Sequence, residues 1–176
     1  MESLIEKAKD GDQIAFTELM LQIKDELYKV AKIRLKNDDD VFDVIQETMI
    51  SAYKSLKKLK HNEYFKTWVI RILINECNKF YKLKKHEQED SYELISNTLI
   101  SCDETDAKIN FKFICDKLGK EEGTIILLYY MEKYTDKEIG EILNMKENTV
   151  RTKRNRIKNK IKNIYKEYGR IWSWMR

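Results

Sequence analysis

The residues of this sequence best suited to binding an anionic partner are the Lys and Arg side chains that follow a short interruption of the apolar pattern near position 145. Seven Lys and Arg residues stand between positions 151 and 162, and Val150, Ile157 and Ile161 recur among them at helical spacing. A helix that buries this apolar stripe presents its cations to an anionic partner. Lysine binds phosphate and arginine forms paired hydrogen bonds with guanine, so the predicted chemistry is noncovalent recognition of duplex DNA.

A helix-turn-helix over residues 134–162 would position these cations. Thr135 and Glu138 have the spacing of a capping box, which starts a helix. Gly140 lies inside that helix, where glycine costs about 1 kcal/mol relative to alanine, so we expect close approach of a second helix there. Asn144-Met145-Lys146 interrupts the apolar pattern and is short enough to turn the chain. The alternative is a helical hairpin with a solvated basic surface.

A second cluster of cations lies in the front half of the chain. Residues 54–85 hold ten Lys and Arg residues against two acids, and residues 146–170 hold the same numbers. Each block therefore has a net charge of +8, and because the whole chain carries +4, the remainder sums to −12. Aromatic residues interleave with the cations of the first block, a pattern suited to single-stranded nucleic acid. The alternative is that these rings form a core and the lysines only solvate a helix.

Composition predicts an all-α fold. The 176 residues include no proline and only five glycines, which favours long helices joined by short polar loops. Residues 87–104 are acidic, contain Ser and Asn and lack clear periodicity, so they are predicted to be a flexible linker. We therefore predict two small helical domains, residues 1–86 and 105–168, the second a four-helix domain with the helix-turn-helix. Residues 169–176, with two tryptophans, form a tail.

Apolar spacing predicts where the helices lie and which faces they bury. The third predicted helix buries Val44, Ile45, Ile50, Tyr53 and Leu56 and turns its polar residues outward. Helices are predicted over residues 3–10, 13–35, 41–57, 63–85, 106–118 and 120–131, followed by the helix-turn-helix.

The sequence shows no pattern of a catalytic or metal site. Its three cysteines and two histidines lack metal-ligand spacing, and we predict neither a metal nor a cofactor. Asp38-Asp39-Asp40, the only dense acidic run, is predicted to be a helix-capping loop, which disfavours a nucleic-acid enzyme. The charged amino terminus lacks a secretory signal and no apolar run approaches membrane-spanning length, so we expect a cytoplasmic protein without direct membrane insertion.

Three stretches of the chain resemble regions of one family. The stretch DVFDVIQETMISAYKSL resembles the region with which members of this family dock on the clamp of a polymerase. The next segment of the family is similar to YFKTWVIRILINECNKFYK, with Phe65, Trp68, Arg71 and Asn75 at the pattern positions. The family's fourth conserved region is similar to LGKEEGTIILLYYMEKYTDKEIGEILNMKENTVRTKRNRIKNKI. About residues 3–165 therefore resemble bacterial RNA polymerase sigma factors of the small, two-domain, extracytoplasmic-function (ECF) type.

The resemblance has departures. Gly119 stands where the family usually has proline, and Asn144 stands where the turn usually carries glycine. Asparagine tolerates left-handed backbone nearly as well as glycine, so we expect the turn to be kept. The recognition helix opens with Asn148-Thr149-Val150 where Gly-Thr-Val is usual. These changes conserve roles and leave the promoter preference open.

The resemblance implies a specificity subunit that directs RNA polymerase core to promoters and initiates transcription, while polymerase supplies all catalysis. The implied partners are promoter DNA, the clamp helices of the largest polymerase subunit, the flap of the second subunit, and an anti-sigma factor that holds the protein inactive. The competing hypothesis is a dimeric helix-turn-helix transcription regulator with an N-terminal sensing domain. It explains residues 120–166 equally well but leaves the basic block at 54–85 unused.

The resemblance also implies roles for individual residues, with His61, Asn62 and Phe65 as the pocket for an unpaired promoter base. Polymerase binding is assigned to Asp43, Gln46, Glu47 and Ser51. The promoter element near the start site is assigned to Lys60, His61, Asn62, Phe65, Lys66, Arg71, Asn75, Asn78, Lys79 and Lys82. In the recognition helix, base edges are assigned to Glu147, Asn148, Arg151, Thr152 and Asn155, and phosphates to Thr149, Lys153 and Arg154.

Overall fold

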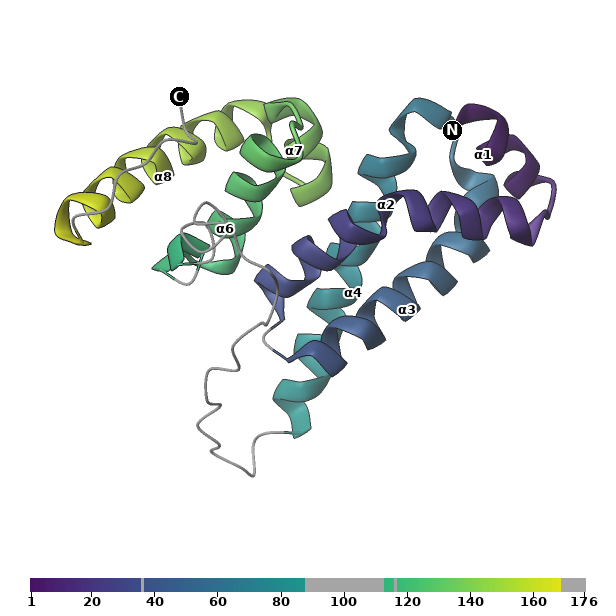
Figure 1. The fold of residues 1–176 in the computed structure, drawn as a ribbon, viewed down its shortest axis with the longest axis horizontal. Coiled ribbons are helices and arrows are strands. Elements are labelled where there is room, and N and C mark those ends of the chain that lie inside the picture. Colours follow the sequence, from purple (N-terminus) through teal and green to yellow (C-terminus); the bar gives the residue numbers. More distant parts are fainter. Residues whose placement is uncertain (36, 88–112, 116, 169–176) are drawn as a thin grey trace. The chain divides into compact units, whose positions relative to one another are not determined.

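The structure, a computed structural model, describes residues 1–35, 37–87, 113–115 and 117–168 (Figure 1). The chain divides into two compact units, residues 1–97 and 98–176. All regular elements in the described ranges are helical, which confirms the predicted all-α class. The predicted linker from residue 88 onward, the first part of the helix predicted over 106–118, and the tail lie outside the described residues.

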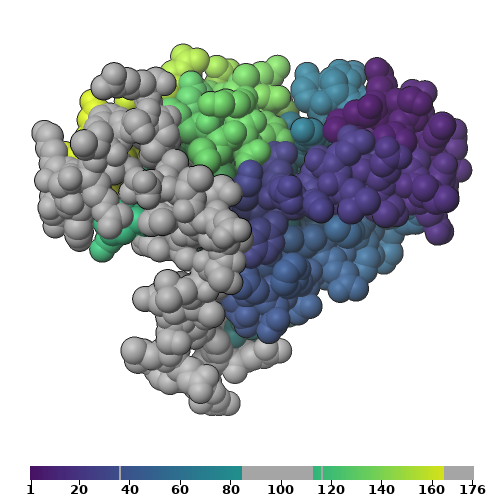
Figure 2. Space-filling view, viewed as in Figure 1, coloured from purple at the N-terminus to yellow at the C-terminus, as the bar shows by residue number. Residues whose placement is uncertain are grey.

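The described part of the first unit is built from four α-helices. The long helix α2 (Gln13–Arg34) packs against α1 (Glu2–Lys9), α3 (Asp38–Ser55) and α4 (Phe65–Glu87), and α3 also packs against α4. Figure 2 shows α1 and α2 in close contact on one face of this unit, with α3 beside them. Two short 3-10 helices, η1 (Leu56–Lys58) and η2 (Asn62–Tyr64), connect α3 to α4.

Side-chain caps set where α2 and α3 begin. Asp12 Oδ1 accepts hydrogen bonds from the backbone N–H groups of Ile14 and Ala15, at 2.9 and 3.0 Å. Asn37 Oδ1 accepts from the backbone N–H of Asp39 at 3.1 Å, so α3 starts earlier than predicted. The acidic run 38–40 therefore forms the first turn of α3 and not a loop before it, where it also complements the helix dipole.

Two of these acids are committed to ion pairs within the unit. Lys32 Nζ lies 2.6 Å from Asp38 Oδ1, and Lys84 Nζ lies 2.7 Å from Asp40 Oδ2. The hydroxyl of Tyr81 on α4 donates to the backbone carbonyl of Arg34 at the end of α2. Partial burial of this phenol raises the pKa of Tyr81 above its ordinary value. These contacts hold the ends of α2, α3 and α4 together.

The core of the first unit uses one face of α3 and leaves another exposed. Val41, Val44 and Ala52 are buried as helical spacing requires. Ile50 and Tyr53 were predicted to be buried, but their exposed fractions are 38% and 39%. The prediction was wrong because α3 carries apolar residues on more of its circumference than the facing helices cover.

The second unit contains the helix-turn-helix. From residue 120 onward, its described elements are α6 (Lys120–Ile126), a π-helical turn η4 (Leu127–Met131), α7 (Asp136–Leu143) and α8 (Glu147–Tyr168), and α6 and α7 both pack against α8. The π-turn ends the predicted helix 120–131, and the backbone N–H of Glu132 donates to Leu127 O at 3.1 Å. Lys133 then takes a left-handed backbone, with φ 62°, before α7 begins.

Across the described ranges no helix has the length and apolarity that crossing a bilayer requires. Within the same ranges, no cluster of three or more His, Cys, Asp and Glu side chains is arranged to hold a metal ion.

Candidate nucleic-acid interface

The first helix of the helix-turn-helix starts with the predicted capping box. Thr135 Oγ1 accepts from the backbone N–H of Glu138 at 3.2 Å, and Glu138 Oε2 accepts from the backbone N–H of Thr135 at 2.8 Å. The helix ends at Asn144, whose φ of 55° and ψ of 48° are left-handed, as predicted for the residue in place of glycine. Both ends of α7 are therefore set by local chemistry.

Gly140 is required by the turn and not by a second helix. A Cβ atom at this position would lie 2.6 Å from the backbone oxygen of Met145. The backbone N–H of Met145 also donates to Gly140 O at 2.8 Å. The predicted close approach therefore exists, but its partner is the carbonyl of the turn, which folds back onto α7. Because glycine has no Cβ, the turn can lie directly against α7 before α8 begins.

Arg154 clamps α8 to the elements before it. Its Nε and Nη2 donate to the two carboxylate oxygens of Asp136, each at 2.9 Å, and its guanidinium lies 4.1 Å from the ring centre of Tyr129. The hydrogen bond from Arg154 is the main reason that the pKa of Asp136 is lowered, and the same bond raises the pKa of Arg154. Phosphate binding was predicted for Arg154, but its side chain is only 16% exposed and serves packing within the unit.

Arg151 is more accessible but is also restrained. Its Nη2 donates to Glu147 Oε1 at 2.9 Å, its Nε lies 3.6 Å from Asp136 Oδ2, and its side chain is 55% exposed. Two carboxylates therefore orient this guanidinium before any ligand binds. Six of the eight predicted recognition-helix residues are exposed along one end of α8, namely Glu147, Asn148, Thr149, Arg151, Thr152 and Asn155.

Two lysines join the recognition helix to α6. Lys153 Nζ lies 2.6 Å from Glu121 Oε1, and Lys160 Nζ lies 2.7 Å from Glu122 Oε2. Partial burial by itself would raise the pKa of Glu122, but hydrogen bonds from Lys160 and from the backbone N–H of Gly119 outweigh it and lower this pKa. Lys153, predicted to bind phosphate, is half-buried and already neutralised by an acid.

In the first unit, the predicted base pocket is only partly open. Lys60 and His61 are exposed and Asn62 is half-buried. Phe65 was predicted to contact DNA, but its side chain is fully buried, with its ring centre 6.2 Å from that of Trp68. Phe65 begins α4 on the face that packs into the core, so its position does not support a contact with DNA.

Five of the remaining predicted residues of this set lie on one side of α4, and helical spacing places the sixth, Lys66, on a different side. A shallow groove where α4 meets α3 is lined by Ser51 and six α4 residues. Glu76, which the sequence analysis did not single out, lies here and accepts from Ser51 Oγ at 3.1 Å and from Lys79 Nζ at 2.8 Å. An acid isolated within a basic block is the signal that could have found it. The exposed members are Lys66, Arg71, Asn75, Asn78, Lys79 and Lys82.

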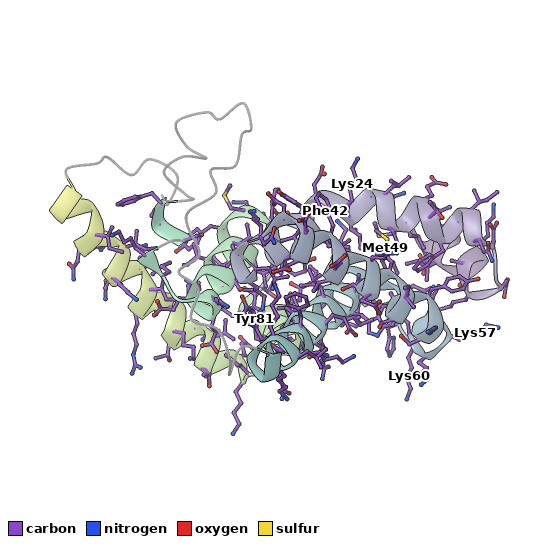
Figure 3. All side chains as sticks on the ribbon, turned by 90° about the horizontal axis from the view of Figure 1, so that it is seen from below. Lys24, Phe42, Met49, Lys57, Lys60 and Tyr81 are labelled. Atoms are coloured by element: carbon purple, nitrogen blue, oxygen red, sulfur yellow. The ribbon has the colours of Figure 1, made fainter. Side chains whose placement is uncertain are left out.

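The outer face of α3 combines acids with exposed apolar groups. Asp43, Gln46 and Glu47 are exposed as predicted. Phe42, at 60% exposure, and Ile50 and Tyr53 lie on the exposed part of the same helix. Figure 3 labels Phe42 and Met49 on α3, and their sequence positions put them about two helical turns apart. Ser51 is separated from this group, because its hydroxyl faces Glu76 on α4. The excess of apolar residues over one helix face was the available signal for Phe42, Ile50 and Tyr53.

Two family models match the chain, and both describe parts of the same protein family. Sigma-70 region 2 matches residues 19–87, which include α3 and α4, and sigma-70 region 4 matches residues 114–161, which include the helix-turn-helix. ECF RNA polymerase sigma factor SigW of Bacillus subtilis is 29% identical over 166 residues, covering 85% of this chain and 88% of the relative. RNA polymerase sigma factor SigV of the same species is 28% identical over 130 residues, covering 74% and 78%.

Solved structures show the same fold. The sigma factor RpoE of Bartonella quintana, in a complex with the anti-sigma factor NepR, matches with a TM-score of 0.75 at 19% identity, covering 86% of this chain and 96% of that one. CnrH, in a complex with the cytosolic domain of CnrY, matches with a TM-score of 0.69 at 20% identity, covering 94% and 97%.

Proposed function

The chain belongs to the ECF sigma factors of the sigma-70 family, and on this premise we propose that it directs RNA polymerase core to specific promoters and initiates transcription there. The observation that carries the proposal is the pairing of two exposed basic surfaces, one in each region matched to the family. In this role the protein binds promoter DNA and positions the polymerase on it, and the polymerase performs all chemistry. The place of action is the cytoplasm.

The two units would divide the promoter between them. We assign residues 1–86 to the element near the start site and residues 105–168 to the element further upstream, with 87–104 as the linker. Joining two weak contacts raises the effective concentration of the second once the first has formed. The isolated protein is therefore expected to bind promoter DNA weakly and with a steep salt dependence.

In the first unit, the exposed cations of α4 would follow the DNA backbone, and the tip of the loop before it would contact an unpaired base. Arg71, Lys79 and Lys82 are exposed on α4 and share its outer side. His61 and Tyr64 are exposed at the tip, with ring centres 6.1 Å apart in an edge-to-face arrangement. Stacking on exposed aromatic rings offsets the cost of taking a base out of the helix. The exposed tip supports base capture without a contribution from Phe65.

The outer face of α3 would bind the clamp helices of the largest polymerase subunit. Its acids, Asp43 and Glu47, would complement a basic partner and orient it. Its exposed apolar residues Phe42, Ile50 and Tyr53 would supply the contact area that carries most of the affinity in interfaces of this kind. The second unit would contact the flap of the second polymerase subunit.

In the second unit, the exposed end of α8 would read bases in the major groove. Arg151 and Asn148 have the donors and acceptors that distinguish guanine and adenine there. Thr149 lies exposed in the same first turns, where a hydroxyl can reach phosphate. Arg154 would act from behind this surface by keeping α8 in place.

We further propose control by an anti-sigma factor. RpoE of Bartonella quintana was solved with such a partner, and CnrH was solved with the cytosolic domain of CnrY. For the present chain, the exposed apolar and acidic face of α3 offers a surface whose coverage would block polymerase binding.

Transcription in vitro with core polymerase and a promoter library tests the function. Addition of the protein is expected to select defined start sites that core polymerase alone does not use. Absence of start-site selection above that of core polymerase would remove the proposal. Sedimentation of the isolated protein distinguishes the sigma-factor hypothesis from the rival hypothesis of a dimeric regulator. A stable dimer would favour a repressor or activator that binds a palindrome.

A further inference from the structure

The short amino-terminal helix α1 holds the loop that leads into α4. Lys9, the last residue of α1, donates from Nζ to the backbone oxygen of Leu59 and to Oδ1 of Asn62, each at 2.7 Å. Asn62 Nδ2 in turn donates to Oε1 of Glu6 at 3.4 Å, one turn earlier on α1. Two side chains of α1 thus hold both the backbone and a side chain of a segment about fifty positions further along the chain.

These bonds enclose the exposed tip of the loop. Leu59 is buried and Asn62 is half-buried, and they flank Lys60 and His61, which are exposed. Helix α1 packs on α2 (Figure 1) and also contacts η1 and η2, so Lys9 reaches the loop from a fixed support. Both ends of the tip are therefore anchored, while its two outermost side chains remain available to a ligand.

The contacts with α1 also set the orientation of the Asn62 side chain. In the observed orientation the amide oxygen faces the Lys9 ammonium and the amide nitrogen faces the Glu6 carboxylate. Rotating the amide by about 180° would place its N–H groups against the Lys9 ammonium and its oxygen against the Glu6 carboxylate, and neither pair can form a hydrogen bond. An asparagine that reads adenine uses its oxygen and its nitrogen together. Held in this way, the Asn62 amide keeps one N–H and one lone pair of its oxygen for a base, both in a fixed direction.

We propose that Lys9 and Glu6 are positioning residues for promoter opening: they hold loop 59–64 in the shape that captures an unpaired base and fix the orientation of the Asn62 amide that meets this base. The inference rests on the proposed function. It gives a role to α1, which precedes residues 19–87, the part matched to sigma-70 region 2. Lys9 acts through Leu59 and Asn62 and does not itself contact DNA, since its ammonium is already bound to two loop oxygens.

The test compares Lys9→Met with Lys7→Met in the full chain assembled with core polymerase. Lys7 lies in the same last turn of α1 and is exposed, so both variants remove one positive charge but only Lys9→Met removes the loop bonds. On a duplex promoter, Lys9→Met is expected to lower open-complex formation about tenfold relative to Lys7→Met. On the same promoter with the start-proximal element left unpaired, most of this difference should disappear, because the base no longer has to be unstacked.

A second readout is base discrimination, which a purely structural role would not change. Transcription from promoters with single-base changes in the start-proximal element should vary less with Lys9→Met than with the wild type. Lys9→Arg, which keeps several donors, should restore most of the discrimination. Asn62→Ala should reproduce the loss of discrimination and serves as the test if Lys9→Met fails to fold.

Two results would overturn the inference while leaving the sigma function in place. In the first, the wild-type protein selects start sites, but Lys9→Met and Lys7→Met form open complexes to the same extent on the duplex promoter. In the second, Lys9→Met loses the same activity on the duplex and the unpaired promoter and keeps the base discrimination of the wild type. A wild-type protein that selects no start sites would instead remove the proposed function itself.

Discussion

Asp136 and Arg154 face each other across the helix-turn-helix, joined by two N–H···O hydrogen bonds of 2.9 Å each. The side chains are 10% and 16% exposed, so the pair is largely shielded from water. Arg151 approaches the same carboxylate from the exposed side at 3.6 Å. One acid at the start of α7 therefore organises two arginines of α8, one for packing and one at the surface.

Replacing Asp136 with Asn should destabilise the second unit. The change leaves the Arg154 guanidinium without a charged partner, and a hydrogen bond to a charged group is worth about 1.5–3 kcal/mol. Denaturant unfolding should show this loss. Glu141→Gln, an exposed acid on the same helix, is the control and should change stability by less than about 0.5 kcal/mol. Equal stability of the two variants would show that the pair contributes nothing.

The same carboxylate should make stability depend on pH in the acid range. The pKa of Asp136 is lowered in the folded state, chiefly by the hydrogen bond from Arg154. A lowered pKa means that the stabilisation is complete above the unfolded value, near pH 4, and is lost as pH falls through the folded pKa. Urea unfolding between pH 7 and pH 3 should therefore show a decline that Asp136→Asn reduces. An identical decline in both proteins would assign it to other acids.

Replacing Gly140 with Ala should destabilise the protein although alanine favours helices by about 1 kcal/mol. The new Cβ would lie 2.6 Å from the backbone oxygen of Met145, and relieving such a contact costs about 1–3 kcal/mol. Gly119→Ala is the control, because a Cβ there meets nothing within 4 Å. Thermal unfolding should separate the variants, and a more stable Gly140→Ala would mean that the turn can shift without cost.

Replacing Arg151 with Ala should alter selection of the upstream promoter element while binding to core polymerase stays intact. Loss of a paired contact to guanine costs about 1–3 kcal/mol of discrimination. The assay is transcription from a library of upstream elements, with Arg156→Ala as a control for removal of an exposed positive charge on the same helix. Loss of polymerase binding by Arg151→Ala would show that its role has been assigned wrongly.

Replacing Phe42 or Tyr53 with Ala should weaken binding to core polymerase. Large apolar side chains at the centre of an interface often contribute more than about 1 kcal/mol each, so we expect a loss of about tenfold for the stronger of the two. Fluorescence anisotropy of the labelled protein with core polymerase measures it. Leu83→Ala, which removes an apolar side chain that is 66% exposed on α4, should leave affinity unchanged. A larger effect at Leu83 than at Phe42 would move the interface to α4.

Local patterns in the sequence were sufficient for the approximate positions of the helices in the described ranges and for the start and end of α7. Capping, apolar periodicity and tolerance of left-handed backbone act over a few residues, so Thr135, Glu138 and Asn144 were predicted correctly. The same patterns failed for Ile50 and Tyr53, which are exposed, and the role that the resemblance implies for Phe65 finds no support in its burial. Periodicity shows that a helix has an apolar face, but which apolar residues are covered depends on how many helices surround it.

The sequence by itself determined the all-α class, the helix-turn-helix and the two basic blocks, because these depend on composition and short-range spacing. Only the tertiary structure decided which cations remain available. Arg154 and Lys153 look like phosphate ligands in the sequence, yet each pairs with an acid of another helix. The tertiary structure also brings Lys9 within hydrogen-bond distance of Leu59 and Asn62. Such pairs connect residues far apart in the chain, and their formation depends on the packing angles of whole helices, which no local pattern encodes.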